Sequence, residues 1–359
     1  MADHDLSVNL GPLAARVPEA LRGSAAYHVP LPPRVVAKLD ANELPYALPA
    51  ELRAGLASAL AEVALERYPD PAARKLRAIV AGKLAVTGEQ LVFGNGSDEL
   101  IAMLCNAFAG PVLYPVPSFV YYKLAAIARG LPCVEVPLTR RFELDEAAVL
   151  RAIDEHRPSV VFLALPNNPT GTLWRMGFAL ELAAHHRDVV IVSDEAYVAY
   201  SGVTNLPELA AHPNLVVMRT LSKIGMAGLR VGFTISSPAI AGVLEKVRPP
   251  YNLSALDQAA AAFLVETAST WASERAAEIV TERARLATAL AAKGLEVFPS
   301  AANLLLVRVQ GPDTATALWR RLADAGISVR SFGDSGLLAG CLRVTVGTAA
   351  DNALLLAAV

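Results

Sequence analysis

The chain has 359 residues, a formal net charge of −2 and 54% hydrophobic residues. This length suits one large domain or two ordinary ones, and the composition allows a substantial core. The near-neutral charge without a basic block argues against nucleic acid as a partner. No apolar run approaches the roughly 18 residues that a membrane span requires.

The chain also lacks the usual signs of secretion and metal binding. Residues 1–11 contain two aspartates and no apolar stretch typical of a secretory signal. Three widely spaced cysteines, Cys105, Cys133 and Cys341, argue against a disulfide framework and favour a reducing compartment, so we expect a cytoplasmic protein. The six histidines have no ligand spacing, and we predict no metal site.

The first 71 residues predict an arm, a strand and a helix. Residues 1–30 contain turn signals and are expected to form an irregular N-terminal arm. The apolar run at residues 35–39 predicts a strand. A helix is predicted from Pro49 to Leu65, because proline suits a first helical turn and leucines recur along one stripe. It is expected to end at residues 67–71, where two prolines prevent its continuation.

From residue 90 to residue 244, short apolar runs alternate with amphipathic stretches. Continuous apolar strands that alternate with helices predict a mostly parallel sheet covered by helices on both faces. The predicted strands are Leu91–Phe93, Val112–Tyr114, Cys133–Val136, Val160–Leu165, Val189–Val192, Leu215–Met218 and Gly232–Ile235. Seven strands in one sheet indicate a single large domain, to which we assign residues 31–245.

The last third of the chain predicts a smaller α+β domain. A long helical region runs from Ser254 to about Lys293, with a bend expected near residues 267–270. Short strand patterns and a helix at Thr314–Ala325 follow it. We therefore assign residues 246–359 to a connecting helix and a small C-terminal domain, and the whole chain to the α/β class.

The turn Gly94–Glu99 follows a predicted strand and begins a helix. Its glycines permit a tight turn, and free N–H groups at a helix start can bind a phosphate. The glycine spacing matches neither the dinucleotide fingerprint nor the P-loop. Ser97 or Asp98 as a simple helix cap is an equally good interpretation of the turn alone.

Polar residues also follow two other predicted strands. Asn168, in the turn Pro166–Gly171, either donates a hydrogen bond to a ligand oxygen or simply forms the turn. Asp194 emerges from a buried strand, where a carboxylate needs a cation or a helix to cap. Tyr197 would face the same side as Asp194 if a helical turn begins there.

The segment Thr220–Arg230 contains Lys223 among hydroxyl groups and small residues. A lysine there can form a Schiff base with a carbonyl, whereas a Ser-Lys pair alone usually indicates a surface lysine. Thr220, Ser222 and Arg230 can together hold a phosphate. With the three turns above, the strand ends offer an anion site, an amide, a carboxylate with a phenol, and a lysine. This set fits one ligand, a pyridine aldehyde phosphate.

The motifs Asn168–Gly171, Asp194–Tyr197 and Ser222-Lys223 with Arg230 resemble those of fold-type I, class-II aminotransferases that use pyridoxal 5′-phosphate (PLP). More narrowly, the chain resembles the histidinol-phosphate aminotransferases. The motifs for this resemblance are Leu39–Glu43, Arg67–Asp70, Gly96–Glu99, Leu221–Arg230 and Gly340–Thr348. They extend over nearly the whole chain, and the cofactor motifs are more specific than the substrate motifs.

The resemblance implies a role for each matching residue. Lys223 would form the Schiff base with the cofactor and move the proton, and Asp194 and Tyr197 would share the catalytic site. The implied cofactor-binding residues are Ser97, Asp98, Phe119, Asn168, Asp194, Tyr197, Thr220, Ser222, Lys223 and Arg230, with Tyr68 reaching across from the neighbouring subunit of a homodimer. Phe119 stands where the family usually stacks a tyrosine, so stacking is retained and a hydroxyl is lost.

The implied substrate-binding residues are Tyr27, Asn168, Arg330 and Arg343. An arginine fork suits a bidentate carboxylate or phosphate. Two arginines therefore fit a site that accepts histidinol phosphate in one half-reaction and 2-oxoglutarate in the other.

The implied reaction produces imidazole-acetol phosphate and glutamate. Two alternatives within the fold are an aromatic amino-acid aminotransferase and a threonine-phosphate decarboxylase. An alternative of another class is a cofactor-sensing transcription regulator with an aminotransferase-like domain. The arm before Tyr27 is too short and not basic enough for the DNA-binding module of such a regulator.

Overall fold

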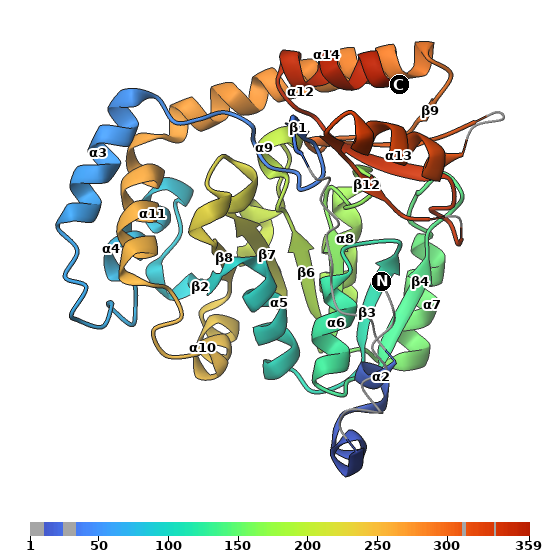
Figure 1. Cartoon of the computed structure of the whole chain (residues 1–359). Helices are drawn as coiled ribbons and strands as arrows, with labels where there is room; N and C mark the ends of the chain where they lie inside the picture. Colours follow the sequence, from blue (N-terminus) through green and yellow to red (C-terminus); the bar gives the residue numbers. More distant parts are fainter. Residues whose placement is uncertain (1–10, 24–33, 311–313, 334) are drawn as a thin grey trace.

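One seven-stranded sheet organises the larger part of the chain (Figure 1). The computed structural model describes residues 11–23, 34–310, 314–333 and 335–359. The strands are β2 (Leu91–Asn95), β3 (Val112–Val116), β4 (Cys133–Pro137), β5 (Val160–Ala164), β6 (Val190–Asp194), β7 (Leu215–Thr220) and β8 (Val231–Ser236). Each overlaps one predicted strand, and the predicted seven-stranded sheet is confirmed.

The strands lie in the order β2-β8-β7-β6-β5-β3-β4. Neighbours from β4 to β7 pair in parallel, and β8 pairs antiparallel with both β7 and β2. The sheet is therefore mostly parallel, as predicted. Because most strands run the same way, their carboxyl ends meet along one edge, where open α/β sheets bind ligands.

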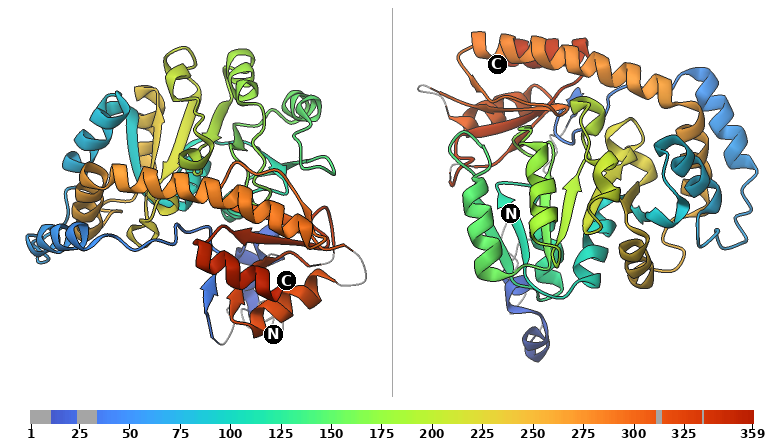
Figure 2. Two further views of the ribbon diagram at one scale, coloured as in Figure 1. Left: turned by 90° about the horizontal axis from the view of Figure 1, so that it is seen from above. Right: turned by 180° about the vertical axis from the view of Figure 1, so that it is seen from behind.

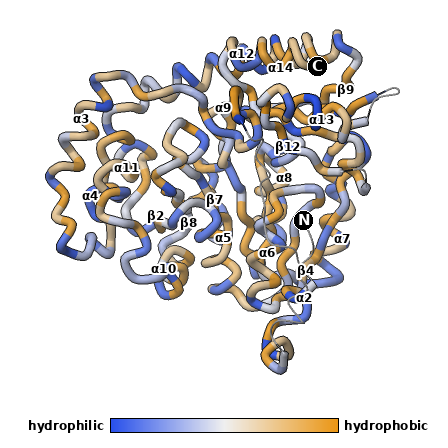
Figure 3. Tube along the Cα trace, viewed as in Figure 1, coloured by the Kyte–Doolittle hydropathy of each residue, from blue (hydrophilic) through white to orange (hydrophobic). Residues whose placement is uncertain are grey.

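Helices cover both faces of this sheet. One face packs against α5 (Gly96–Ala107), α6 (Tyr121–Ala128) and α10 (Pro238–Val247), and the other against α4 (Arg74–Leu84), α7 (Glu146–His156), α8 (Met176–His185) and α11 (Ala255–Thr267). Every residue of β5 is buried, since its successive side chains face opposite layers. Hydrophobic and hydrophilic residues alternate along the covering helices (Figure 3).

A second, smaller sheet lies beyond the long helix α12 (Ser269–Ala292), which Figure 2 shows running between the two parts. Its strands are antiparallel, in the order β12 (Arg330–Ser331), β13 (Cys341–Thr345), β10 (Leu304–Arg308) and β9 (Glu296–Val297). Helices α13 (Ala315–Asp324) and α14 (Ala349–Ala358) complete this unit. The predicted bend between α11 and α12 occurs at Ala268.

The N-terminal segment differs in part from its prediction. Residues 11–23 form two short helical turns, η1 (Gly11–Arg16) and α2 (Glu19–Arg22), rather than irregular backbone. Helix α3 (Ala50–Ala61) ends four residues earlier than predicted, because Leu65 is 73% exposed and extension of the helix would bury little. The predicted strand near residue 37 is β1 (Ala37–Lys38), which pairs in parallel with β11 (Ile327–Ser328).

This pairing brings the start of the chain beside its last third. The domain boundaries expected near residues 30 and 245 stay predictions. No helix in the described ranges combines the length and the apolar composition needed to cross a membrane.

The sequence analysis missed α14, although its start has a recognisable cap. Thr348 Oγ1 accepts a hydrogen bond from the Asp351 N–H (3.2 Å), and Asp351 Oδ2 accepts one from the Thr348 N–H (3.0 Å). This reciprocal pair satisfies two donors that a helix start otherwise leaves without partners. The helix then packs through Leu355, which is fully buried.

Replacement of this cap tests its contribution to stability. We expect Thr348→Ala to lower the free energy of unfolding by about 1 kcal/mol, measured by urea denaturation. Thr288→Ala is the matched control, because the Thr288 hydroxyl lies on the exposed side of α12 and donates only to Ala284 O. Equal effects of the two substitutions would contradict the capping role.

Candidate active site

A pocket of about 130 Å³ opens where the carboxyl ends of β5, β6 and β7 meet. The residues that line it are Ser97, Asp98, Phe119, Tyr122, Ala164, Pro166, Asn168, Asp194, Ala196, Tyr197, Thr220, Ser222, Lys223 and Arg230. They include every residue predicted to bind the cofactor except Tyr68. Residues from α5, α6 and the loops that follow β3, β5, β6 and β7 therefore converge on one site.

Lys223 reaches the pocket from η4 (Leu221–Lys223), the turn that follows β7. Its Nζ donates to the carbonyl oxygen of Ala41 at 3.1 Å. The Tyr200 hydroxyl donates to the carbonyl oxygen of Lys223 itself and holds the backbone of the turn. Burial, and then the nearby positive charge of Arg343, lower the pKa of Lys223 to about 8. A larger share of the amine is thus unprotonated near neutral pH than on an exposed lysine, which makes it a better nucleophile and base.

Asp194 is the last residue of β6, and its side chain is buried. The Tyr122 hydroxyl donates to its Oδ2 at 2.6 Å, and the Ala196 N–H donates to its Oδ1 at 3.1 Å. Burial raises the pKa of the carboxyl group to about 6, while these two hydrogen bonds oppose that rise. At neutral pH the pocket therefore contains an anion that can pair with a cationic group of a ligand.

Tyr122 is a site residue that the sequence analysis missed. It lies in α6 and is fully buried, with its ring stacked on Phe162 at 4.6 Å and edge-on to Phe119 at 5.7 Å. The only sequence signal that was available is its aromatic ring three residues after Phe119. Its contact with Asp194 depends on how α6 sits over β6, which the sequence does not give.

Asn168 connects the pocket directly to the smaller domain, and Tyr197 connects to it through Asn42, which is bonded to Asn303 and Thr345. Asn168 Oδ1 accepts a hydrogen bond from Arg343 Nη1 at 2.7 Å, and Tyr197 Oη accepts one from Asn42 Nδ2 at 2.8 Å. The preceding residue, Asn167, holds the turn in place, since its Oδ1 accepts from Ser118 and its Nδ2 donates to Pro117 O.

The other end of the pocket has the donors that an anion needs. Arg230 Nη1 donates to Ser222 Oγ at 3.3 Å, and Nη2 pairs with Asp98 Oδ2 at 3.0 Å. Thr220 Oγ1 lies 3.0 Å from Ser222 Oγ. Gly96 is required here, because its φ is 77° and a Cβ atom would lie 2.5 Å from Arg230 Nη2. Hydroxyls, a guanidinium and the N–H groups at the start of α5 thus surround one position.

Three of the predicted residues, Tyr68, Arg330 and Arg343, do not line the pocket. Tyr68 is 81% exposed and outside the pocket, stacked on Tyr251 with ring centroids 4.6 Å apart. Arg330 lies on β12, opposite Arg343 on β13. Arg343 does not line the pocket but reaches it through Asn168, and also donates to Asp40 O. Tyr27 lies outside the described residues.

This donor set fits PLP, because one pocket contains an anion site, a lysine and a buried carboxylate. Residues 34–359 match the family described as Aminotransferase class I and II. The chain therefore belongs to the aminotransferases of class I and II, enzymes that depend on PLP.

The relatives narrow this class. Histidinol-phosphate aminotransferase 2 of Cupriavidus pinatubonensis is 45% identical over 94% of both chains. Histidinol-phosphate aminotransferase 1 of Burkholderia lata is 46% identical over 89% of this chain and 90% of that protein. The crystal structure of histidinol-phosphate aminotransferase from Sinorhizobium meliloti in complex with PLP is 25% identical, with a TM-score of 0.83 over 96% of both chains. The chain belongs to the histidinol-phosphate aminotransferase family, and the resemblance inferred from its motifs is confirmed.

The raised pKa of Asp194 predicts a trade-off between stability and function. Since the folded pKa of about 6 lies above the ordinary value of 3.8, the folded state binds more protons between these values. The stability that Asp194 contributes in its neutral form is therefore lost as the pH rises through about 6. Asp194→Asn should raise the free energy of unfolding of the cofactor-free protein at pH 8 by about 1–3 kcal/mol, and by less at pH 5.

Urea denaturation at the two pH values measures this effect, and Asp188→Asn, at an exposed carboxylate, is the control. The same Asp194→Asn protein should bind the cofactor more weakly. A variant that is less stable than wild type at pH 8 would refute the proposed cost of burying this carboxylate.

Proposed function

We propose that the protein transfers the amino group of histidinol phosphate to 2-oxoglutarate, giving imidazole-acetol phosphate and glutamate in histidine biosynthesis. The main support is the convergence of Lys223, Asp194 and an anion site on one pocket, in a chain 45% identical to a histidinol-phosphate aminotransferase. PLP, when bound, supplies an electron sink for the substrate carbon that loses a proton.

The proposed cofactor contacts divide the pocket into three parts. Ser97 and Asp98, through their backbone N–H groups, hold the phosphate together with Thr220, Ser222 and Arg230. Asp194 pairs with the protonated ring nitrogen, and Tyr122 keeps its carboxylate oriented. Asn168 and Tyr197 hold the ring oxygen, and Phe119 packs against the ring face.

Lys223 is proposed to act as the acid and base that transfers the proton. Its Nζ removes the proton from the amine-bearing carbon of the substrate and keeps it available for return. A pKa of about 8 suits this task, because a base works best when its pKa lies near the working pH. The carbonyl of Ala41 accepts a hydrogen bond from Nζ and limits where the amine can move.

Substrate recognition is assigned to the side of the pocket that faces the smaller domain. Arg343 is oriented by Asn168 and can bind a carboxylate or phosphate with its planar fork. Arg330 lies beside it in the register of β12 and β13 and offers a second cationic group. Tyr27 is retained as a predicted substrate contact.

We also propose that the enzyme is a cytoplasmic homodimer in which Tyr68 contacts the cofactor phosphate of the neighbouring subunit. Tyr68 is 81% and Leu65 73% exposed, and α3 buries none of its residues. Exposed apolar residues grouped in this way are typical of a subunit interface. The three cysteines are free, which fits a reducing compartment.

A half-reaction screen tests the proposed substrate. Each candidate amine is mixed with the cofactor-loaded enzyme, and the change in cofactor absorbance is followed by stopped flow. Histidinol phosphate should react at least about 100-fold faster than phenylalanine, tyrosine or threonine phosphate, because a site built for a polar group rejects analogues that leave it without a partner.

Lys223→Ala should lower turnover by about 10⁴-fold or more, while Lys246→Ala, an exposed lysine of α10, should not change it. If phenylalanine or threonine phosphate reacts faster than histidinol phosphate, the proposed substrate is wrong. Retained multiple turnover by Lys223→Ala would exclude the proposed mechanism.

Subunit mixing tests the shared site. A dimer of one Lys223→Ala chain and one Tyr68→Phe chain contains one site with both substitutions and one native site, if Tyr68 serves the neighbour. Random mixing should then restore wild-type cofactor affinity at about a quarter of all sites. If each subunit uses its own Tyr68, every site in the mixed dimer carries one substitution, and no native affinity returns.

A further inference from the structure

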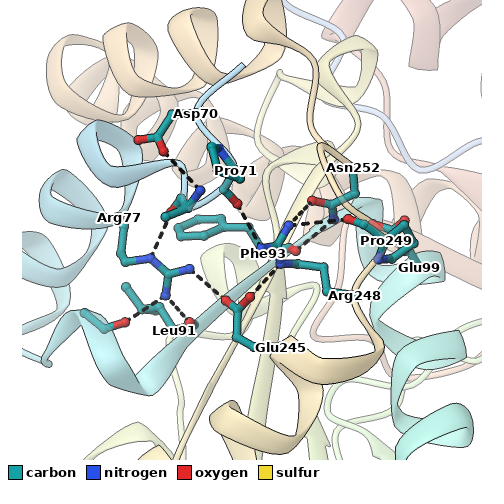
Figure 4. A network of polar contacts seen from close by, with 12 residues as sticks. Asp70, Pro71, Arg77, Leu91, Phe93, Glu99, Glu245, Arg248, Pro249 and Asn252 are labelled. Atoms are coloured by element: carbon teal, nitrogen blue, oxygen red, sulfur yellow. Dashed lines mark hydrogen bonds and ion pairs between the residues drawn. The ribbon is translucent and has the colours of Figure 1, made fainter. Parts of the chain in front are cut away.

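A polar network lies outside the pocket, between the start of α5 and the loop that follows α10 (Figure 4). Asn252 is at its centre. Asn252 Nδ2 donates to Glu99 Oε2 at 2.6 Å and to Phe93 O at 3.1 Å, and its Oδ1 accepts from Arg248 Nη1 at 3.0 Å. These partners fix the orientation of the amide.

Glu99 transmits this arrangement to the turn Gly94–Asp98, which we call the α5 turn. The same oxygen, Glu99 Oε2, accepts the backbone N–H of Asn95 at 2.6 Å. The Asn95 side chain in return donates to Asn252 O at 3.4 Å. Glu99 therefore ties the residue before the helix to its first turn, in the manner of a capping box. The N–H groups of Ser97 and Asp98, which follow directly, take their direction from this turn.

Arg248, which donates to the Asn252 amide oxygen, is itself held by other contacts. Its side chain is 13% exposed, its Nε donates to Glu245 Oε2 at 2.7 Å, and its Nη2 donates to Pro71 O at 2.8 Å. Glu245 Oε1 also accepts from Arg77 Nη2 at 2.9 Å, which connects the network to α4 (Figure 4). The planar guanidinium serves these acceptors from three separate nitrogens in a fixed geometry, whereas a lysine has a single nitrogen.

We propose that Asn252, supported by Arg248, is a positioning residue for the phosphate group of the cofactor. Asn252 does not line the pocket and acts through Glu99 on the N–H groups of the α5 turn. Its amide also draws the negative charge of Glu99 into a hydrogen bond on the side away from the pocket. Loss of the amide loosens the turn and leaves that charge less compensated, and both effects oppose an anion at the start of α5.

The inference rests on the proposed function, because it requires a phosphate at the α5 turn. It is separable from that function by comparing two ligands, PLP and pyridoxal, which share the ring and the aldehyde and differ only in the phosphate. A residue that positions the phosphate should affect the first ligand and not the second. A residue needed only for general stability should affect both.

The experiment measures the dissociation constants of both ligands for the cofactor-free dimer by absorbance titration. Asn252→Ala should weaken PLP binding about tenfold, the loss expected for one hydrogen bond to a charged group, and change pyridoxal binding less than about twofold. Asn214→Ala is the matched control, because Asn214 Nδ2 also donates to two acceptors, His186 O (3.0 Å) and Val189 O (2.8 Å), at the opposite edge of the sheet. For Asn214→Ala, the ratio of the PLP dissociation constant to the pyridoxal dissociation constant should equal the ratio for the wild-type protein.

Far-UV circular dichroism shows whether Asn252→Ala is folded. If it is not, Arg248→Lys provides a second variant that tests the same role. Arg248→Lys should also lose affinity for PLP and not for pyridoxal. The loss should be smaller, about threefold, because the lysine keeps one of the arginine's contacts. Arg175→Lys, at an exposed arginine paired with Glu146 and Glu181, should show none. Unchanged affinities, or equal losses for PLP and pyridoxal, would overturn the positioning role. A wild-type protein that binds neither ligand would instead overturn the proposed function, and this inference with it.

Discussion

The burial of a carboxylate at the end of β6 is the constraint on which the rest of the site depends. Asp194 and the next residue, Glu195, are both buried, yet their surroundings differ. Glu195 pairs with Arg219 at 2.9 Å and accepts hydrogen bonds from Thr204 and Asn205. Within the part of the chain that the structure describes, the Asp194 carboxylate accepts hydrogen bonds from neutral donors, the Tyr122 hydroxyl and the Ala196 N–H. In the proposed function, a cationic ring nitrogen would supply the positive charge that these donors lack, so the unfavourable burial of this carboxylate would favour cofactor binding.

Most of the large domain could be predicted from the sequence, and the reason is physical. Strands buried on both faces appear as continuous apolar runs, and parallel strands place their carboxyl ends at one edge. Asn168, Asp194 and Lys223 could therefore be grouped before their distances were known. Tyr122 and Asn252 could not, because their contacts depend on the packing of a helix over a strand and on a loop that meets residues more than 150 positions away. The same limit applies to Arg343, whose partner Asn168 lies 175 positions earlier.

The smaller domain contributes to the pocket without lining it. Asn303, just before β10, donates to Asn42 O at 3.0 Å, and Asn42 in turn donates to Tyr197. Thr345 of β13 accepts the Asn42 N–H at 2.9 Å, which holds Asn42 in a left-handed conformation with φ 55°. Residues of both domains thus hold the Tyr197 phenol in position, and a shift of the small sheet would move it.

Arg248 has a genetic consequence in the proposed homodimer. There it would support the α5 turn of its own subunit and, through Pro71 O, the loop proposed to present Tyr68 to the neighbour. One altered chain in a mixed dimer would therefore disturb both active sites, one from within and one from across the interface. A cell with one normal and one altered copy of the gene would then have weakened cofactor binding at about three quarters of its sites, rather than at half of them.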